Sequence, residues 1–68
     1  MKITLAYQDE QQALYVDGLL VLKGRDIDIE EIFQALELSF ESKEVEFDWF
    51  WNEKDGKFTR VMNRIKFV

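Results

Sequence analysis

Acids at alternate positions are the first candidates for chemistry, because spaced carboxylates can bind a metal ion. The run Asp26-Ile27-Asp28-Ile29-Glu30 has the acid spacing of the start of a calcium-binding loop. Such a loop needs its turning glycine at the position that Glu31 occupies, and isoleucines fill the intervening sites. Entry into a helix, with Asp28 and Glu31 as an acidic capping pair, explains the run better. We therefore expect no metal site here.

Histidine and cysteine are both missing from the sequence. A Ser-His-Asp or Cys-His catalytic arrangement therefore cannot be assembled, and the commonest general base is lacking. The acid clusters fall in predicted turns, caps and solvent-facing positions, where burial does not tune a carboxyl group for acid–base catalysis. The glycines lie too far apart to form a phosphate-binding loop. We expect a protein without enzymatic activity and without a cofactor.

Basic residues gather near the C-terminus. The chain carries nine bases and fourteen acids, for a net charge of −5, yet residues 57–68 contain no acid. The bases of this segment are Lys57, Arg60, Arg64 and Lys66. With Phe50 and Phe58 they could imitate a basic surface with stacking aromatics for nucleic acid. Because acids of the same fold can pair with these bases, and net negative charge repels phosphates, we do not expect direct nucleic-acid binding.

The opposite electrostatic hypothesis is an acidic inhibitor or nucleic-acid mimic that blocks a basic protein surface. The candidate acidic surface consists of Glu30, Glu31, Glu37 and Glu41, helped by the loop Asp9-Glu10. An acidic helix face is more often a solvated face than a binding site. We keep this function as the alternative to the one reached below.

The elements that position these residues begin with strands. Apolar side chains recur at every second position from Ile3 to Tyr7, and a second apolar run spans Ala13–Val16. The dipeptide Asp17-Gly18 is a strong two-residue hairpin signal between that run and Leu19–Leu22. The first third of the chain therefore predicts strands joined as an antiparallel meander.

The single helix is predicted over Asp26–Glu37. Its apolar stripe consists of Ile29, Ile32, Phe33 and Leu36, and Phe40 can extend it. A strand that follows such a helix joins the sheet most easily beside a parallel neighbour.

A second hairpin is predicted in the last third. Val45, Phe47, Trp49 and Trp51 alternate with acids in EVEFDWFWNE, which is typical of a strand with one buried face. The loop Lys54-Asp55-Gly56, with Gly56 in the left-handed conformation, would connect it to a strand in residues 57–68.

That register pairs opposite charges and one aromatic–arginine couple across the strands. The expected pairs are Glu53 with Lys57, Phe50 with Arg60, Glu46 with Arg64, and Glu44 with Lys66. On the apolar face, Trp51 is expected opposite Thr59, Trp49 opposite Val61, Phe47 opposite Asn63, and Val45 opposite Ile65. An amphipathic helix is the alternative, because Phe58, Val61, Met62 and Ile65 also have helical spacing.

These elements predict an α+β fold: one two-layer domain over residues 1–68, with a mostly antiparallel sheet in the order β-β-β-α-β-β and one helix on one face. The first hairpin places Val16 opposite Leu19 and Leu14 opposite Val21 on one face. Its other face carries Ala13, Tyr15, Leu20 and Leu22, so both faces are apolar. One helix covers one face only, and the alternative for the other face is that the C-terminal segment folds over it. The candidate partner-binding residues on the other are Tyr15, Leu20, Leu22 and Phe50.

Composition limits the classes of function that remain. A chain of 68 residues, 47% of them hydrophobic, can fold around one small core that leaves much of its surface in water. No apolar run has the length of a signal peptide core or of a membrane span, so we expect a cytoplasmic protein that does not enter a membrane. The leading hypothesis is a small non-catalytic protein-interaction or regulatory module. It would bind a protein partner or form a homodimer through the uncovered face or the adjoining sheet edge.

Overall fold

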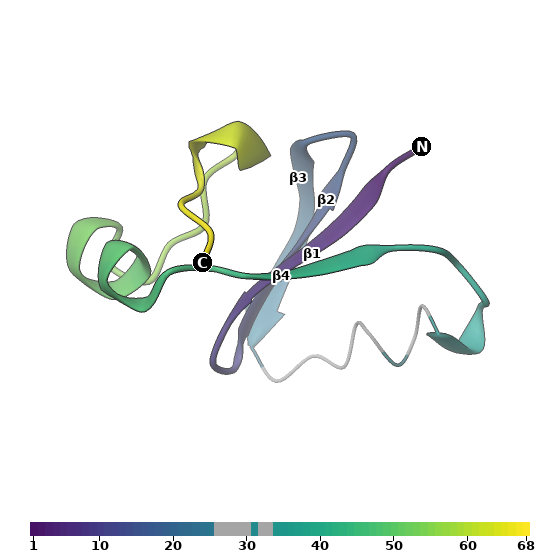
Figure 1. Ribbon diagram of the computed structural model, residues 1–68, viewed down its shortest axis with the longest axis horizontal. Helices are drawn as coiled ribbons and strands as arrows, with labels where there is room; N and C mark the ends of the chain where they lie inside the picture. Colours follow the sequence, from purple (N-terminus) through teal and green to yellow (C-terminus); the bar gives the residue numbers. More distant parts are fainter. Residues whose placement is uncertain (26–30, 32–33) are drawn as a thin grey trace.

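A mixed four-stranded sheet is the centre of the computed structural model, which describes residues 1–25, 31 and 34–68 (Figure 1). The strands are β1 (Ile3–Gln8), β2 (Gln11–Val16), β3 (Leu19–Arg25) and β4 (Glu41–Glu44). Their order across the sheet is β3-β2-β1-β4. The two pairs within the meander are antiparallel, and β1 pairs with β4 in parallel. The predicted meander is confirmed. A strand after residues 26–37 does pair in parallel with a neighbour, but it is Glu41–Glu44 and not the predicted strand that follows it in the sequence.

A β-bulge changes the predicted register of the first hairpin. Asp17 and Gly18 both have positive φ, at 51° and 83°, and this turn places Val16 opposite Leu19 as predicted. The register then shifts between Leu14 and Tyr15, so that Leu14 faces Leu22 instead of Val21. Because side chains alternate between the faces of a sheet, the shift moves Leu22 to the face opposite Tyr15.

The predicted strand through the tryptophans is wrong, because a helical turn forms there. The turn contains a π-helix at Trp49–Glu53. The amide of Phe50 donates to the carbonyl of Glu46 at 3.0 Å, and that of Lys54 donates to Trp49 at 3.2 Å. The rings of Phe47 and Trp51 have centroids 6.5 Å apart, as residues four apart on a helix do.

The physical reason for this outcome is Phe50, which interrupts the alternation of the apolar residues around it. A strand would turn Phe50 away from Trp49, whereas the helical turn buries both side chains. Phe47 is 59% exposed instead, so it is not the core residue that the alternation predicts.

The C-terminal segment forms neither the predicted long strand nor the alternative helix. Its only helical turn in the described structure is a 3-10 helix at Met62–Arg64. It does meet the acids after β4 in antiparallel fashion, through a bridge between Val45 and Phe67. The amide of Glu46 donates to the carbonyl of Lys66 at 2.9 Å, and their side chains form an ion pair at 3.2 Å. Lys66 therefore pairs with Glu46, two residues away from the predicted partner.

The same segment also reaches the opposite edge of the sheet. Val61 forms an antiparallel bridge with Leu19, and the amide of Leu20 donates to the carbonyl of Arg60 at 2.9 Å. Figure 1 shows this part of the chain, coloured green to yellow, gathered on one side of the sheet. The C-terminal segment thus crosses from the β3 edge to the residues that follow β4.

The two faces of the sheet have different covers. We call the side that carries Ala6, Ala13 and Tyr15 the Tyr15 face, and the side that carries Ile3, Leu5 and Leu14 the Leu5 face. The core on the Tyr15 face is completed by residues that follow β4, namely Val45, Trp49, Phe50, Phe58 and Ile65. On the Leu5 face, the three named side chains are buried and Phe40 packs against them.

The predicted helix falls largely outside the described residues, namely at 26–30 and 32–33. Glu31, Gln34 and Ala35 have helical backbone, and the amide of Glu37 donates to the carbonyl of Gln34 at 3.1 Å. Leu36 is exposed, so it is not part of a buried stripe. In the described parts of the chain, no helix combines the length and the apolar composition that crossing a membrane requires.

Candidate functional site

Two of the predicted partner-binding residues lie in the core. Tyr15 and Phe50 are fully buried. The Tyr15 hydroxyl donates to the carbonyl of Thr59 at 2.5 Å, and the Phe50 ring lies 4.7 Å from the Phe58 ring and 4.9 Å from the Trp51 ring between centroids. The expectation that the Tyr15 face lacks an intramolecular cover is therefore wrong, since the C-terminal segment supplies one.

Burial also changes the acid–base behaviour of Tyr15. Loss of solvent around the ring raises the pKa of the Tyr15 phenol above its ordinary value, and its hydrogen bond with Thr59 opposes part of the rise. The phenol therefore remains neutral at neutral pH, and its hydroxyl serves as a structural donor that fixes the C-terminal segment to the sheet.

Three of the exposed apolar side chains lie on β3. Val21 is 62% exposed, Leu19 57% and Leu22 47%, whereas Leu20 is half-buried. We call Leu19, Val21 and Leu22 the β3 apolar edge. Only Leu22 among the predicted partner-binding residues belongs to it. Sequence reasoning assigned Val21 to the buried side of the hairpin, and the bulge beside it is the feature that reasoning missed.

The free side of β3 begins after Leu20. Residues 21–25 pair with β2 on one side, and within residues 1–25, 31 and 34–68 no strand pairs with them on the other. An unpaired strand edge presents backbone donors and acceptors to any extended chain that approaches it. The β3 edge is thus a place where another strand can add to the sheet.

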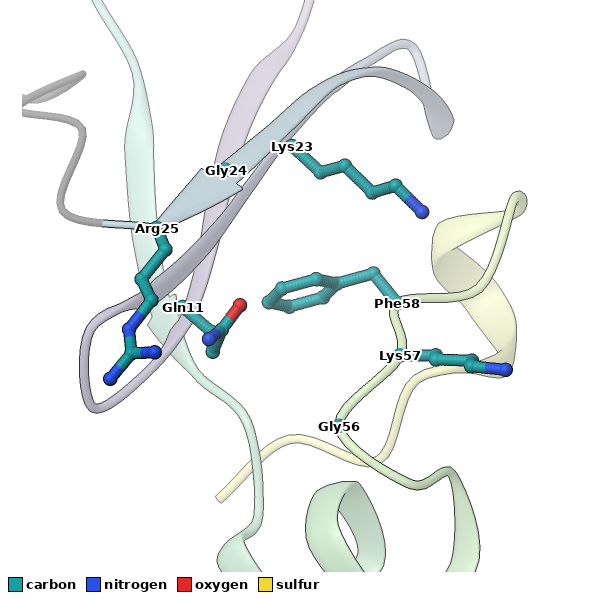
Figure 2. Close-up of a pocket in the computed structure, with 7 residues that line it drawn as sticks. All are labelled: Gln11, Lys23, Gly24, Arg25, Gly56, Lys57 and Phe58. Carbon is teal, nitrogen blue, oxygen red and sulfur yellow. The ribbon is translucent and has the colours of Figure 1, made fainter.

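A pocket of about 280 Å³ opens next to this edge (Figure 2). Strand residues Gln11, Lys23, Gly24 and Arg25 line one side of it. The C-terminal segment supplies the other side, which consists of Gly56, Lys57 and Phe58. Figure 2 shows the Phe58 ring directed toward Gln11, with Lys23 of β3 above it and the Lys57 side chain extending away from the ring.

The side chains around the pocket are basic, although the whole protein is acidic. No ion pair is found for Lys23 or Lys57 in the described part of the chain. Arg25 contacts Glu10 through its Nε atom at 3.4 Å, and both side chains are largely exposed. The pocket therefore combines an aromatic wall with three cations, and for Lys23 and Lys57 none of the described acids lies within salt-bridge distance.

Sequence reasoning found Lys57 and Phe58 but grouped them with other bases of the same segment. Arg64 and Lys66 do not line the pocket, and Lys66 pairs with Glu46. Lys23 and Arg25 were missed. The predicted strand ended at Leu22, whereas β3 continues to Arg25. The alternate spacing of Lys23 and Arg25 directly after the predicted strand was the signal that could have placed them on one face.

The predicted acidic surface is only partly described. Glu30 lies outside the described residues, and Glu31, Glu37 and Glu41 are exposed. Glu41 lies on β4 and forms an ion pair with Lys2 at 3.4 Å. Glu37 has a φ of 58°, which takes it out of a regular helix. The acidic inhibitor stays a prediction to which these positions add no support.

The described residues contain no group of His, Cys, Asp and Glu side chains that could hold a metal ion. Comparison of the chain with protein-family models, with curated proteins and with solved structures finds no match. The geometry of the β3 edge and its pocket is therefore the basis for the function proposed next.

Proposed function

We propose that this protein is a small, non-catalytic interaction module that contacts a protein partner through the outer edge of β3. The observation that carries the proposal is the exposure of Val21 and Leu22 on a strand whose outer side is unpaired over the described residues. Apolar exposure and an open edge favour the same event, because strand addition satisfies the backbone while neighbouring side chains are buried.

Among the described residues, the other exposed large apolar side chains lie outside the four strands. Phe47 is also exposed, but it lies in the helical turn, where the backbone is already hydrogen-bonded within the segment. Burial of apolar side chains contributes about 25 cal/mol per Å² before the costs of association are subtracted. A few apolar side chains with one strand edge therefore support a modest, reversible contact.

Site-specific photo-cross-linking tests this proposal. A photoreactive phenylalanine analogue is placed at Val21 in one variant and at Phe47 in a matched variant, since both positions are exposed. The proposal expects a discrete protein adduct from position 21 in the cells that make this protein, and none from position 47. Adducts of equal yield and size from both positions would refute the β3 edge as the contact surface.

Self-association through this edge is the version of the proposal in which the partner is a second copy. Sedimentation equilibrium of the wild type beside Val21→Lys tests it, because lysine places a charge in the contact without disturbing a buried residue. A dimer that the substitution shifts toward monomer identifies the second copy as partner. A wild type that stays monomeric at millimolar concentration leaves the edge to a different protein.

A further inference from the structure

We infer that the partner binds as an extended, acidic segment, which adds to the free edge of β3 and places carboxylates at the basic pocket. This inference rests on the proposed interaction function and names the chemistry of the partner. The pocket and the edge are one site, because Lys23, Gly24 and Arg25 belong to both.

The register of the sheet defines which ligand side chains would meet the pocket. Lys23 pairs with Ala13 and Arg25 pairs with Gln11, so both basic side chains lie on the Tyr15 face. A strand added along residues 21–25 would also alternate, and every second side chain would lie on that face. Acids at alternate ligand positions therefore fall beside Lys23 and Arg25.

The other half of the ligand side chains would lie on the Leu5 face, beside Leu22. Leu22 is on that face because the bulge shifts it opposite Leu14, and it is 47% exposed. An apolar ligand side chain there would remove part of Leu22 from water. The site thus fits a strand in which acidic and apolar residues alternate.

Charge complementarity favours this ligand over a second copy of β3. The free stretch of residues 21–25 is centred on Lys23. A two-fold antiparallel pairing about that centre would oppose Lys23 to itself, and like charges directly opposite are destabilising. A carboxylate in the same place would instead meet Lys23, which has no ion pair in the described structure, at the rim of a pocket that Arg25 and Lys57 also line.

Lys57 and Phe58 form the side of the pocket that lies across from β3. They come from the C-terminal segment, on the opposite side of the pocket from β3. Arg25 has a contact to Glu10 through Nε at 3.4 Å, so a ligand carboxylate would compete with one exposed acid for it. Charge-assisted hydrogen bonds to such cations are stronger than neutral ones, and bidentate geometry is open to an arginine.

The test uses seven-residue peptides, the length of β3, in which valine alternates with glutamate, glutamine or lysine. Each peptide has blocked ends and is titrated into the ¹⁵N-labelled full chain while amide chemical shifts are followed. The valine–glutamate peptide is expected to shift the amides of residues 21–25 together with Lys57 and Phe58. The glutamine peptide should bind more weakly, and the lysine peptide should not bind.

A pair of charge reversals locates the effect. Lys57→Glu changes the pocket, whereas Arg64→Glu makes the same charge change at an exposed residue that does not line it. Reversing one exposed charge in the site should weaken binding of the glutamate peptide roughly fivefold or more, and reversal at Arg64 much less. Equal weakening by both variants would overturn the inference, because net charge alone would then explain binding.

Further outcomes separate this inference from the proposed function. If all three peptides shift the β3 edge equally, the edge accepts strands without acidic preference; the inference fails and the interaction function stands. If no peptide binds while the cross-link from Val21 forms, the partner uses another chemistry, and the inference again fails alone. A titration with inorganic phosphate at constant ionic strength completes the set. Suppose that phosphate shifts only the amides of the pocket while the glutamate peptide shifts none at the β3 edge. That result would indicate a site for free anions and would refute the inference that an acidic strand binds.

Discussion

The two faces of the sheet differ in where their cover comes from. On the Tyr15 face, Trp49 and Phe50 from the helical turn and Phe58 from the C-terminal segment pack in one core with side chains of β1 and β2. On the Leu5 face, the buried side chains are aliphatic and Phe40 is the described residue packed against them. Leu22 on that face remains substantially exposed.

This difference separates stability from recognition within one small sheet. The C-terminal segment holds the Tyr15 face with large rings, a buried phenol hydrogen bond and backbone bonds at both sheet edges. Because the segment meets β3 only at its beginning, it leaves residues 21–25 open. Substitutions in the cover should therefore cost stability, whereas substitutions on the open edge should cost binding.

The largest effect is expected from Phe50→Ala. The ring is fully buried between other aromatics, so truncation leaves a cavity that a small core cannot refill, and it should cost about 3–5 kcal/mol of unfolding free energy. Denaturant unfolding measures the loss. Phe47→Ala is the matched control, because Phe47 lies in the same turn and is largely exposed. A larger loss for Phe47→Ala than for Phe50→Ala would contradict the helical turn and support the predicted strand.

A glycine pair tests how tightly that turn packs. Gly56 has a φ of 71°, and a Cβ atom there would lie 2.7 Å from the Trp51 ring. Gly18 has a φ of 83°, but a Cβ atom added to it would have no neighbour within 4 Å. Alanine at either site should cost about 1–2 kcal/mol for the left-handed backbone.

The crowding at Trp51 should add about 1–3 kcal/mol to the cost of Gly56→Ala alone. The difference between the two alanine variants in chemical denaturation therefore measures the Trp51 contact, with the backbone term removed. Equal destabilisation of both variants would show that the ring moves aside freely.

Tyr15→Phe should have a smaller effect, which depends on pH. Loss of the hydroxyl leaves the Thr59 carbonyl without its donor and should cost about 1–2 kcal/mol near neutral pH. Because the pKa of the folded phenol is raised above the ordinary value near 10.0, the unfolded chain releases this proton first as pH rises. The contribution of the raised Tyr15 pKa to the free energy of unfolding is fully present below pH 10, and it is lost as pH rises through the pKa of the folded phenol.

Unfolding free energies of the wild type and Tyr15→Phe across alkaline pH provide the measurement. The difference in unfolding free energy between the wild type and Tyr15→Phe should shrink as pH rises above 10. A constant difference at every pH would mean that the Tyr15 phenol titrates alike in the folded and unfolded states.

Sequence patterns predicted the elements whose signal is local. The meander and its Asp17-Gly18 turn follow from short apolar runs around a dipeptide that accepts positive φ. A parallel strand was expected after the predicted helix, but β4 lies before the segment that was expected to form it. The left-handed Gly56 was also predicted, with the wrong elements on either side of it. Turns whose residues require positive φ could therefore be predicted from the sequence alone.

The wrong predictions have one physical cause. The chain has more apolar residues than one face of the sheet can bury, so tertiary packing decides which of them enter the core. Phe47, Trp49, Phe50 and Trp51 fit a strand or a helical turn almost equally, and the need to bury Phe50 on the Tyr15 face decided between them. The bulge beside Leu14 has no comparable local signal, although it determines where Leu22 points. The pocket was missed because it joins β3 to residues that were expected in a hairpin of their own.

The smallest stability effect is expected on the open edge, from Val21→Thr. Threonine retains the β-branched shape that favours a strand, and Val21 is 62% exposed, so the free energy of unfolding should change by less than about 0.5 kcal/mol. Partner capture measured by cross-linking from neighbouring Leu22 should nevertheless fall, because threonine reduces the apolar area that a partner would bury. A matched Phe47→Tyr substitution should change neither quantity, since Phe47 lies away from β3 in the helical turn. Strong destabilisation by Val21→Thr would show that β3 is covered on its outer side. Val21, the most exposed residue of the β3 apolar edge, would then contradict the distinction between a Tyr15 face that provides stability and an edge that binds a partner.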